Sequence, residues 1–382
     1  MHAIRAVAAL IAMGAGISPL AHADTNDEIA QMRAELKALR ESYEARIGAL
    51  ERKLQEAEAH AAAAPLPAPP APSTAPGPSA FNPAISTVLQ GSYANRTHGP
   101  DRGFSLAESE ITLSANVDER FAGALTASLT PEDTVSVEEA YGVYTGAPYG
   151  LVPKFGRFLS GIGYLNEQHA HAWDFIDAPL AYQAFLGGNY RTDGLQVKWV
   201  APTELFLELG GEAGRGGEFP GVARDKNGIG SAAGYLHLGG DVGDSHSWRA
   251  GVSYLDPGSA SSIRMADFVW KWAPDGNGVE RNAKVQGEYF RQPGSAASSG
   301  YYVQGVYQFM PRWRVGLRYD RLDTPGEAFD SRRASAMVDW SPSEFSRFRL
   351  QLQRAQLMPD RTDNELFVQY ILTLGAHGAH KY

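Results

Sequence analysis

Cysteine is absent from the 382 residues of this chain, which excludes disulfide bridges, thiolate metal sites and a cysteine nucleophile. The absence also suits an oxidising compartment, where a stray thiol would react. Long apolar runs are missing too, because no segment after the N-terminus reaches the roughly 18 apolar residues that a membrane helix needs. Charged residues make up only 20% of the chain and the net charge is −9, so nucleic acid is not an expected partner.

Residues 1–23 are typical of a secretory signal peptide. Arg5 provides a positive charge, a short apolar core follows, and AHA at residues 21–23 is a small-x-small cleavage site. A short membrane anchor is the alternative, but the apolar run is too short to span a bilayer. We therefore expect an exported protein that is either soluble or inserted into a membrane as a β-barrel.

Residues 24–59 predict a coiled-coil helix. Apolar residues recur three and four positions apart, with one extra four-residue step between Tyr43 and Ile47. A single amphipathic helix lying on the protein would show the same stripe. We expect the coiled coil to join protomers into a homo-oligomer, with a homotrimer as the predicted state. Residues 60–80 are rich in alanine and proline and predict an extended linker.

Beyond residue 80 the apolar period changes to two, which is typical of β-strands. In RWRVGLRYD, for example, Arg314 and Arg318 fall on one face, while Trp313 and Leu317 fall on the other. Aromatic residues end many apolar faces, as expected at the two interfaces of a membrane, and short links alternate with longer ones. We predict an all-β fold for residues 81–382, a transmembrane up-and-down antiparallel β-barrel of about 16 strands. Its place would be the bacterial outer membrane, with the coiled coil in the periplasm.

The faces opposite the aromatic ones would line the barrel interior, where charged side chains are tolerated. Acidic residues dominate the early strands, and arginines gather in the late ones. The prediction is an acidic wall of Glu108, Glu110, Glu208 and Glu212 and a basic wall of Arg314, Arg318, Arg347 and Arg349. These walls would either orient polar solutes in a water-filled channel or form ion pairs that stiffen the barrel.

Residues 159–192 form the longest predicted external loop, and it is unusually apolar. A freely solvated loop would not carry so many apolar residues, so we expect it to fold into the barrel. The pore constriction would then be formed by Glu167, His169, His171, Trp173, Asp174 and Asp177. In an extended segment His169 and His171 point the same way, and they could hold a divalent metal ion with Glu167 or Asp174. Imidazole with carboxylate suits Zn²⁺ or Ni²⁺. The alternative is that both histidines only form hydrogen bonds with the loop and the wall.

The order of signal peptide, coiled coil, proline-rich linker and 16-stranded barrel resembles the phosphate-selective (O/P-type) porins. The run from VEEAYGVY to GYLNEQHAHAWDF is similar to the strands that lead into their infolded third loop. FNPAI, the same loop motif and GAHGAHKY resemble more closely a group of proteobacterial outer-membrane barrels. Those proteins are loosely labelled porins, or zinc-regulated or TonB-dependent receptors. The acidic, histidine-bearing loop departs from the arginine-lined path of phosphate porins. TonB-dependent transport is not expected, because such receptors need a 22-stranded barrel and a plug.

These features predict a porin-like channel for passive diffusion of small polar or ionic solutes, narrowed by the third external loop. One alternative is a barrel whose His/carboxylate site takes part in zinc uptake. Another is a loop-sealed barrel with a structural or receptor role. An enzyme is not expected, because no serine stands in a recognisable motif beside His169, His171 or His237. Apart from Zn²⁺, no cofactor is predicted. The expected partners are outer-membrane lipid, further copies of the chain and the solutes.

Overall fold

The computed structural model describes Lys37 and residues 83–98, 102–130, 134–216, 228–258, 261–294, 299–323 and 329–375. The predicted signal peptide, the linker and, apart from Lys37, the coiled coil lie outside the described residues, as does the C-terminal tail. The chain divides into two units, Met1–Gly77 and Pro78–Tyr382, and the second unit holds the fold considered below. In the described part of the chain no helix has the length and apolar character to cross a bilayer.

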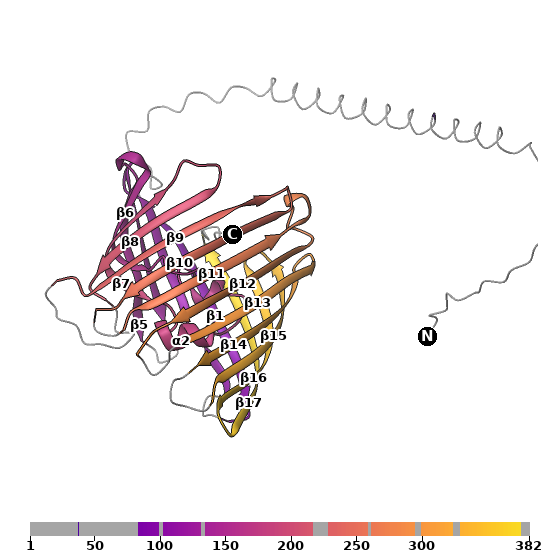
Figure 1. The fold of residues 1–382 in the computed structure, drawn as a ribbon. Helices are drawn as coiled ribbons and strands as arrows, with labels where there is room; N and C mark the ends of the chain where they lie inside the picture. Colours follow the sequence, from indigo (N-terminus) through magenta and orange to yellow (C-terminus); the bar gives the residue numbers. More distant parts are fainter. Residues whose placement is uncertain are drawn as a thin grey trace, which may run out of the picture. The chain divides into compact units, whose positions relative to one another are not determined.

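The second unit is one antiparallel sheet that closes on itself, because β1 pairs with β17 from Ser86 to Arg96 (Figure 1). Neighbours in sequence pair in turn around the ring, which is the predicted up-and-down order. The strands are β1 (Ala84–Arg96), β2 (Gly103–Leu106), β3 (Ser109–Asn116), β4 (Phe121–Leu129), β5 (Val135–Tyr144), β6 (Leu151–Leu159), β7 (Arg191–Val200), β8 (Phe206–Gly214), β9 (Ser231–Val242), β10 (His246–Asp256), β11 (Ile263–Trp272), β12 (Asn282–Arg291), β13 (Ser299–Met310), β14 (Trp313–Asp323), β15 (Ser331–Ser343), β16 (Ser346–Met358) and β17 (Arg361–Gly375).

β2 and β3 are two halves of one barrel strand. Both pair with β1, at Gly91↔Leu106 and at Val88↔Glu110. The 17 strand segments among the described residues therefore make 16 barrel strands, as predicted. The prediction of a single strand over residues 104–117 missed this break, across which the register against β1 shifts by one residue. Gln90 of β1 spans the break, since its side chain donates to the carbonyl of Glu108 at 2.7 Å.

The barrel is apolar outside and polar inside, the reverse of a soluble protein. On β14, Val315, Leu317 and Tyr319 are exposed on the outer surface, whereas Arg318 and Asp320 are buried. This inversion is the pattern of a transmembrane barrel, whose outer face contacts lipid. Around the end that carries the short turns, the rings of Trp313, Trp340 and Phe348 stack in a row, with centroids 5.8 and 5.9 Å apart. Such a row suits a membrane interface.

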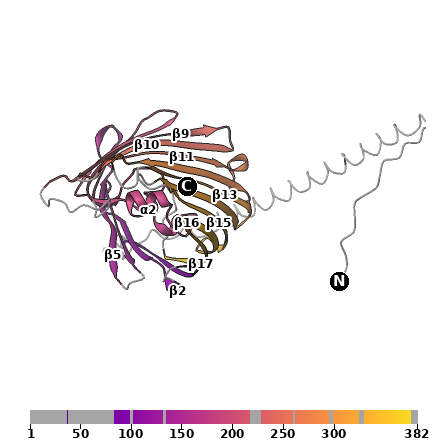
Figure 2. The same cartoon turned by 60° about the horizontal axis from the view of Figure 1, so that its bottom comes forward.

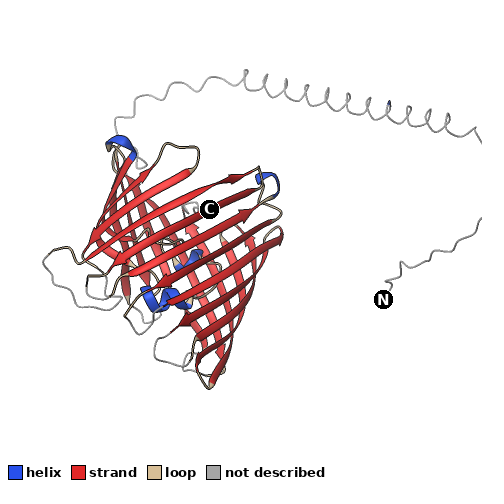
Figure 3. Ribbon diagram, viewed as in Figure 1, coloured by secondary structure: helices blue, strands red, loops and turns tan. Residues whose placement is uncertain are grey.

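Connection lengths alternate around only part of the ring. The link between β11 and β12, predicted to be short, has nine residues, whereas the links before and after it have six and seven. Pro359 and Asp360 alone connect β16 to β17, so the longer external loop predicted around them is wrong. The two strands instead extend to Met358 and Arg361 and close in a tight turn. Figure 3 shows the three one-turn 3-10 helices η1 (Pro148–Gly150), η2 (Ala170–Ala172) and η3 (Pro274–Gly276), and the helix α2 (Leu180–Leu186).

The long connection between β6 and β7, residues 160–190, lies inside the barrel. Figure 2 shows its helix α2 enclosed by the ring of strands. An apolar core forms between this loop and the inner wall of β9–β13. The loop contributes residues such as Ile162, Trp173, Tyr182, Phe185 and Leu186, and the wall contributes Tyr235, Leu255, Ile263, Met265, Phe290 and Tyr302. The apolar composition of the loop is thereby explained, because burial removes these side chains from water.

Candidate functional site: the loop inside the barrel

The loop enters the lumen at a crowded glycine. Gly163 has φ +66, and a Cβ added there would lie 2.4 Å from Oε2 of Glu288. The backbone N–H of Gly163 donates to Ser253 Oγ at 3.0 Å, and its carbonyl accepts from Arg249 at 2.6 Å. Two steps earlier, the N–H of Gly161 donates to Glu212 at 2.8 Å. Only a residue without a side chain fits this conformation and this space.

Glu288 of β12 anchors the first part of the loop. Its carboxylate accepts hydrogen bonds from the backbone N–H of Tyr164 and Leu165 and from the hydroxyls of Tyr182 and Tyr302, at 2.8–3.1 Å. Burial, with the neighbouring carboxylate of Glu288, raises the pKa of the Tyr182 hydroxyl well above its ordinary value. A buried carboxylate with this many donors holds the chain in one position.

Asp174 attaches the middle of the loop to the basic side of the barrel. Its carboxylate accepts from Lys284 Nζ at 2.5 Å, from Arg314 at 3.1 Å and from Gln304 at 3.0 Å. Burial on its own would raise the pKa of this carboxyl. The charges of Lys284 and Arg314 outweigh burial and hold the pKa well below its ordinary range.

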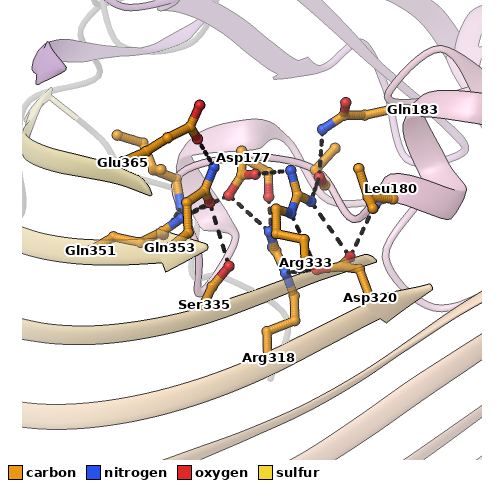
Figure 4. Close-up of polar contacts among 12 residues, drawn as sticks. Asp177, Leu180, Gln183, Arg318, Asp320, Arg333, Ser335, Gln351, Gln353 and Glu365 are labelled. Carbon is orange, nitrogen blue, oxygen red and sulfur yellow. Dashed lines mark hydrogen bonds and ion pairs between the residues drawn. The ribbon is translucent and has the colours of Figure 1, made fainter. Parts of the chain in front are cut away.

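Asp177 makes the second attachment to the same side (Figure 4). It pairs with Arg318 at 2.8 Å and with Arg333 at 2.5 Å, and it accepts from Gln351 at 2.8 Å. Burial would raise its pKa, but the two guanidinium groups lower it to about 2. Asp320 completes the network, because it pairs with both arginines and accepts from the N–H of Leu180 at 2.9 Å.

The predicted basic wall is therefore largely occupied in holding the loop. Arg314 also pairs with Asp339 at 2.5 Å, and Arg349 donates to the carbonyl of Trp173 at 2.8 Å. Arg347 is half-buried on β16. The carboxylates Asp320 and Asp339 and the arginine Arg333 were missing from the predicted site, although alternation along β14 and β15 would have placed all three on the inner face.

The two histidines attach the loop to glutamates on the acidic side of the barrel. His169 Nδ1 lies 2.7 Å from Glu138 Oε2 and 3.4 Å from Glu110 Oε2, while its Nε2 lies 3.0 Å from Glu139 Oε2. His171 Nδ1 lies 2.9 Å from Glu110 Oε1, and the two imidazole rings stack with centroids 5.8 Å apart. Burial lowers the pKa of His169, but the hydrogen bonds to Glu138 and Glu139 outweigh it and raise the pKa to about 11.

The two carboxylates predicted to share a metal ion with the histidines form ion pairs with lysines. Glu167 pairs with Lys198 Nζ at 2.6 Å, and Asp174 pairs with Lys284. The histidine partners are Glu110, Glu138 and Glu139. The last two were not predicted, because β5 has a register shift against β4, where Thr126 faces Glu139 and Ala127 faces Val137. Glu138 is the extra residue of this bulge, and a bulge breaks the alternation on which face assignment depends.

The remaining residues of the predicted acidic wall have separate roles. Glu212 accepts from Gln196 at 2.7 Å as well as from the loop, and Glu208 pairs with His237 at 3.0 Å. Glu108 is half-buried and lines a cavity of about 930 Å³ that the loop leaves along β1, β2, β16 and β17. Other lining residues are Gln90, Arg96, Gln183, Arg333, Gln353 and Glu365. Acidic and basic side chains therefore both line this cavity.

Solved structures similar to this chain are outer-membrane barrels. OprB of Pseudomonas putida matches with a TM-score of 0.55 and 15% identity, over 77% of this chain and 94% of that chain. An anion-selective porin from Comamonas acidovorans matches with a TM-score of 0.53 and 9% identity, over 76% and 98%. The outer membrane channel DcaP of Acinetobacter baumannii matches with a TM-score of 0.52 and 13% identity, over 76% and 96%. At these identities the likeness concerns the fold.

No protein-family model matches the chain, so membership of the phosphate-selective porins stays a prediction. One protein of Aquifex aeolicus (strain VF5), named only as an uncharacterized protein, is 30% identical over 79% of this chain and 80% of its own length. An alignment of this extent includes most of the barrel, because the described strands begin at Ala84 and end at Gly375. The chain therefore belongs to the same family as this Aquifex aeolicus protein, and its fold is that of the outer-membrane porin barrels.

Proposed function

We propose that this protein is an outer-membrane channel through which small polar or ionic solutes diffuse passively. The observation that carries the proposal is the cavity of about 930 Å³ beside the loop, because a space lined partly by charged and amide side chains is what a diffusion channel for polar solutes needs. The fold shared with porins and an outer membrane channel supports it. The predicted signal peptide and the apolar outer surface support an outer-membrane location, and we propose that the predicted coiled coil lies in the periplasm.

The route would pass between the loop and the strands β1, β2, β16 and β17. There a solute meets the amides of Gln90, Gln353 and Gln369, which can bond to groups of either charge. Arg333 lies on one side of this route and Glu108 on the other. Arg333 is already paired with Asp177 and Asp320, so we expect only a weak preference for one sign of ion.

The loop would set the width of the pore, because it is attached to several walls at once. Asp174 and Asp177 hold it to β12, β14 and β15, and the histidines hold it to β3 and β5. We further propose that the chain assembles as a homotrimer through the coiled coil and the barrel wall. We assign no enzymatic activity to it.

Single-channel conductance of the refolded mature protein in a planar bilayer tests the proposal. We expect stepwise openings in groups of three, with a small reversal potential in a KCl gradient. The double variant Asp174→Asn/Asp177→Asn removes the ion pairs of both loop carboxylates with the basic side and should give larger or noisier openings. Asp363→Asn is the matched control, because that carboxylate pairs with the exposed His98 away from the loop.

A correctly folded barrel without any conductance would overturn the channel proposal. The loop would then seal the lumen, and a structural or receptor role would remain. Conductance that is identical in the wild type and in the double variant would show that the loop does not set the pore width.

A further inference from the structure

The contacts of His169 place three metal-ligating groups around one point. One ligand atom from each of Glu110, Glu138 and His169 can be chosen so that all three lie within 4.8 Å of one another. From the Nδ1 of His169, the carboxylate oxygens of Glu138 and Glu110 are 2.7 and 3.4 Å away. Tetrahedral zinc with bonds of about 2.0–2.1 Å places its ligand atoms about 3.4 Å apart. The His169–Glu110 distance matches this spacing, whereas His169 and Glu138, now at hydrogen-bond distance, would have to separate by roughly 0.7 Å to admit the ion.

We propose that Glu110, Glu138 and His169 form a binding site for a divalent cation of the zinc type, which fastens the loop to the β3–β5 wall. The proposal does not depend on the channel function, because it concerns binding and loop attachment. Imidazole with carboxylates selects borderline ions such as Zn²⁺, whereas Ca²⁺ and Mg²⁺ prefer oxygen ligands alone.

The surroundings of these three residues are those of a supported metal site. Glu139 accepts from the second ring nitrogen of His169 at 3.0 Å, which fixes the orientation of the imidazole. His171 holds the other oxygen of Glu110 at 2.9 Å. Ligating histidines and carboxylates are commonly held by such partners, which orient the ligand atoms toward the ion.

The β5 bulge is an independent feature that points to the same place. Glu138 is the additional residue in the register against β4, so this wall presents Glu138 and Glu139 side by side to one imidazole. Bulges are common next to functional sites, where they redirect a side chain. With Glu110 included, three carboxylates contact the two histidines, and a divalent cation would compensate more of this charge than a proton can.

The same contacts also suit a protonated His169 held between carboxylates. The experiment must therefore distinguish a bound metal ion from a proton on the imidazole. Full-length protein refolded in detergent is stripped with EDTA and titrated with Zn²⁺ by calorimetry. Co²⁺ is added to a second sample, and its visible absorption is recorded. We expect one site per chain. His377→Gln and His380→Gln are present in every sample, because the two histidines of the C-terminal tail could bind metal on their own.

The variants His169→Gln and Glu138→Gln should each weaken Zn²⁺ binding by at least about 100-fold, and Glu139→Gln by about 10–100-fold. His98→Gln is the matched control, since this exposed histidine also lies 2.6 Å from a carboxylate, Asp363, and its loss should leave affinity unchanged. Zn²⁺ should also slow proteolytic cleavage of the loop several-fold in the wild type but not in Glu138→Gln. Far-UV circular dichroism and heat-dependent gel mobility establish that each variant is folded.

Two results would overturn the proposal. One is the absence of saturable Zn²⁺ or Co²⁺ binding by the folded wild type at micromolar concentrations, which would leave a protonated histidine clamp. The other is unchanged affinity in both His169→Gln and Glu138→Gln. Binding is measured in detergent and without solute flux. Neither result therefore bears on the channel proposal, which conductance tests separately.

Discussion

At the residue scale, the position of the loop depends on a few contacts that tolerate little change. Gly163 has a positive φ and no room for a Cβ, and Asp177 lies between two arginines. Both residues contact strands far away in the sequence. Gly163 contacts β10 and β12, and Asp177 forms ion pairs with β14 and β15. Substitutions at these positions should move the loop before they affect the barrel.

Gly163→Ala should loosen the loop, because the new Cβ would meet the Glu288 carboxylate and Tyr182 as well as an unfavourable φ. Gly188→Ala is the matched control, since Gly188 also has a positive φ, +112, but nothing lies within 4 Å of its added Cβ. Limited proteolysis of the loop should be faster in Gly163→Ala than in Gly188→Ala. Equal rates would show that crowding at Gly163 does not matter.

Asp177 should make stability depend on pH in acid. Its pKa is lowered from an ordinary value of 3.8 to about 2, so its ionised form stabilises the fold above pH 3.8. That contribution is lost as the pH falls through about 2. Relative to Asp177→Asn, the wild type should gain roughly 2 kcal/mol of unfolding free energy at neutral pH, and the gain should vanish near pH 2. Urea unfolding between pH 7 and pH 2 measures the difference, and a difference independent of pH would contradict the assignment.

At the scale of elements, the loop is held in place by an apolar core that it shares with the barrel wall. Helix α2 has seven residues, too few to be stable alone, so packing must hold it. It begins after Pro179 and ends at Gly187, which takes the left-handed conformation common after helices. The ring of Phe185 stacks on Phe290 of β12 with centroids 5.6 Å apart.

Phe185→Ala should release α2 without unfolding the barrel. Removing a fully buried phenylalanine costs about 3–5 kcal/mol, and here most of that cost falls on the attachment of the loop. Gln183→Ala, on the same helix but exposed, is the comparison. Loop proteolysis should rise in Phe185→Ala alone while the β-sheet circular dichroism is unchanged. Loss of the sheet signal would show that the loop is needed for barrel formation.

At the scale of the whole molecule, the inverted distribution of side chains implies a lipid environment. Leu317 is 69% exposed on the outer surface, where water would be unfavourable. Leu317→Arg should therefore lower the free energy of unfolding from a lipid vesicle by about 2–4 kcal/mol if the position lies near the bilayer midplane. Val279→Arg is the control, because Val279 is 71% exposed in the connection between β11 and β12. Urea titration in lipid vesicles measures both variants, and equal effects would contradict a lipid-facing Leu317.

Period-two alternation was enough to predict the barrel. Each strand exposes one face to lipid and one to the interior, so its sequence records both environments, and 16 barrel strands were found where 16 segments alternate. The break at Ala107 and Glu108 was missed, although the exposed apolar residues change there from even positions, Phe104 and Leu106, to odd positions such as Ile111. The tight turn at Pro359 and Asp360 was missed because polar residues there also suit a longer loop.

What the sequence by itself determined was therefore the fold class and the infolding of the apolar loop. Which partner each residue takes was decided only by the tertiary structure. Asp174 and Asp177 meet β12–β15, and His169 meets β3 and β5, because strands far apart in sequence line one lumen. Alternation assigns a side chain to a face but not to a neighbour across the barrel. A bulge such as that at Glu138 changes even the face, since one additional residue shifts the register between the strands.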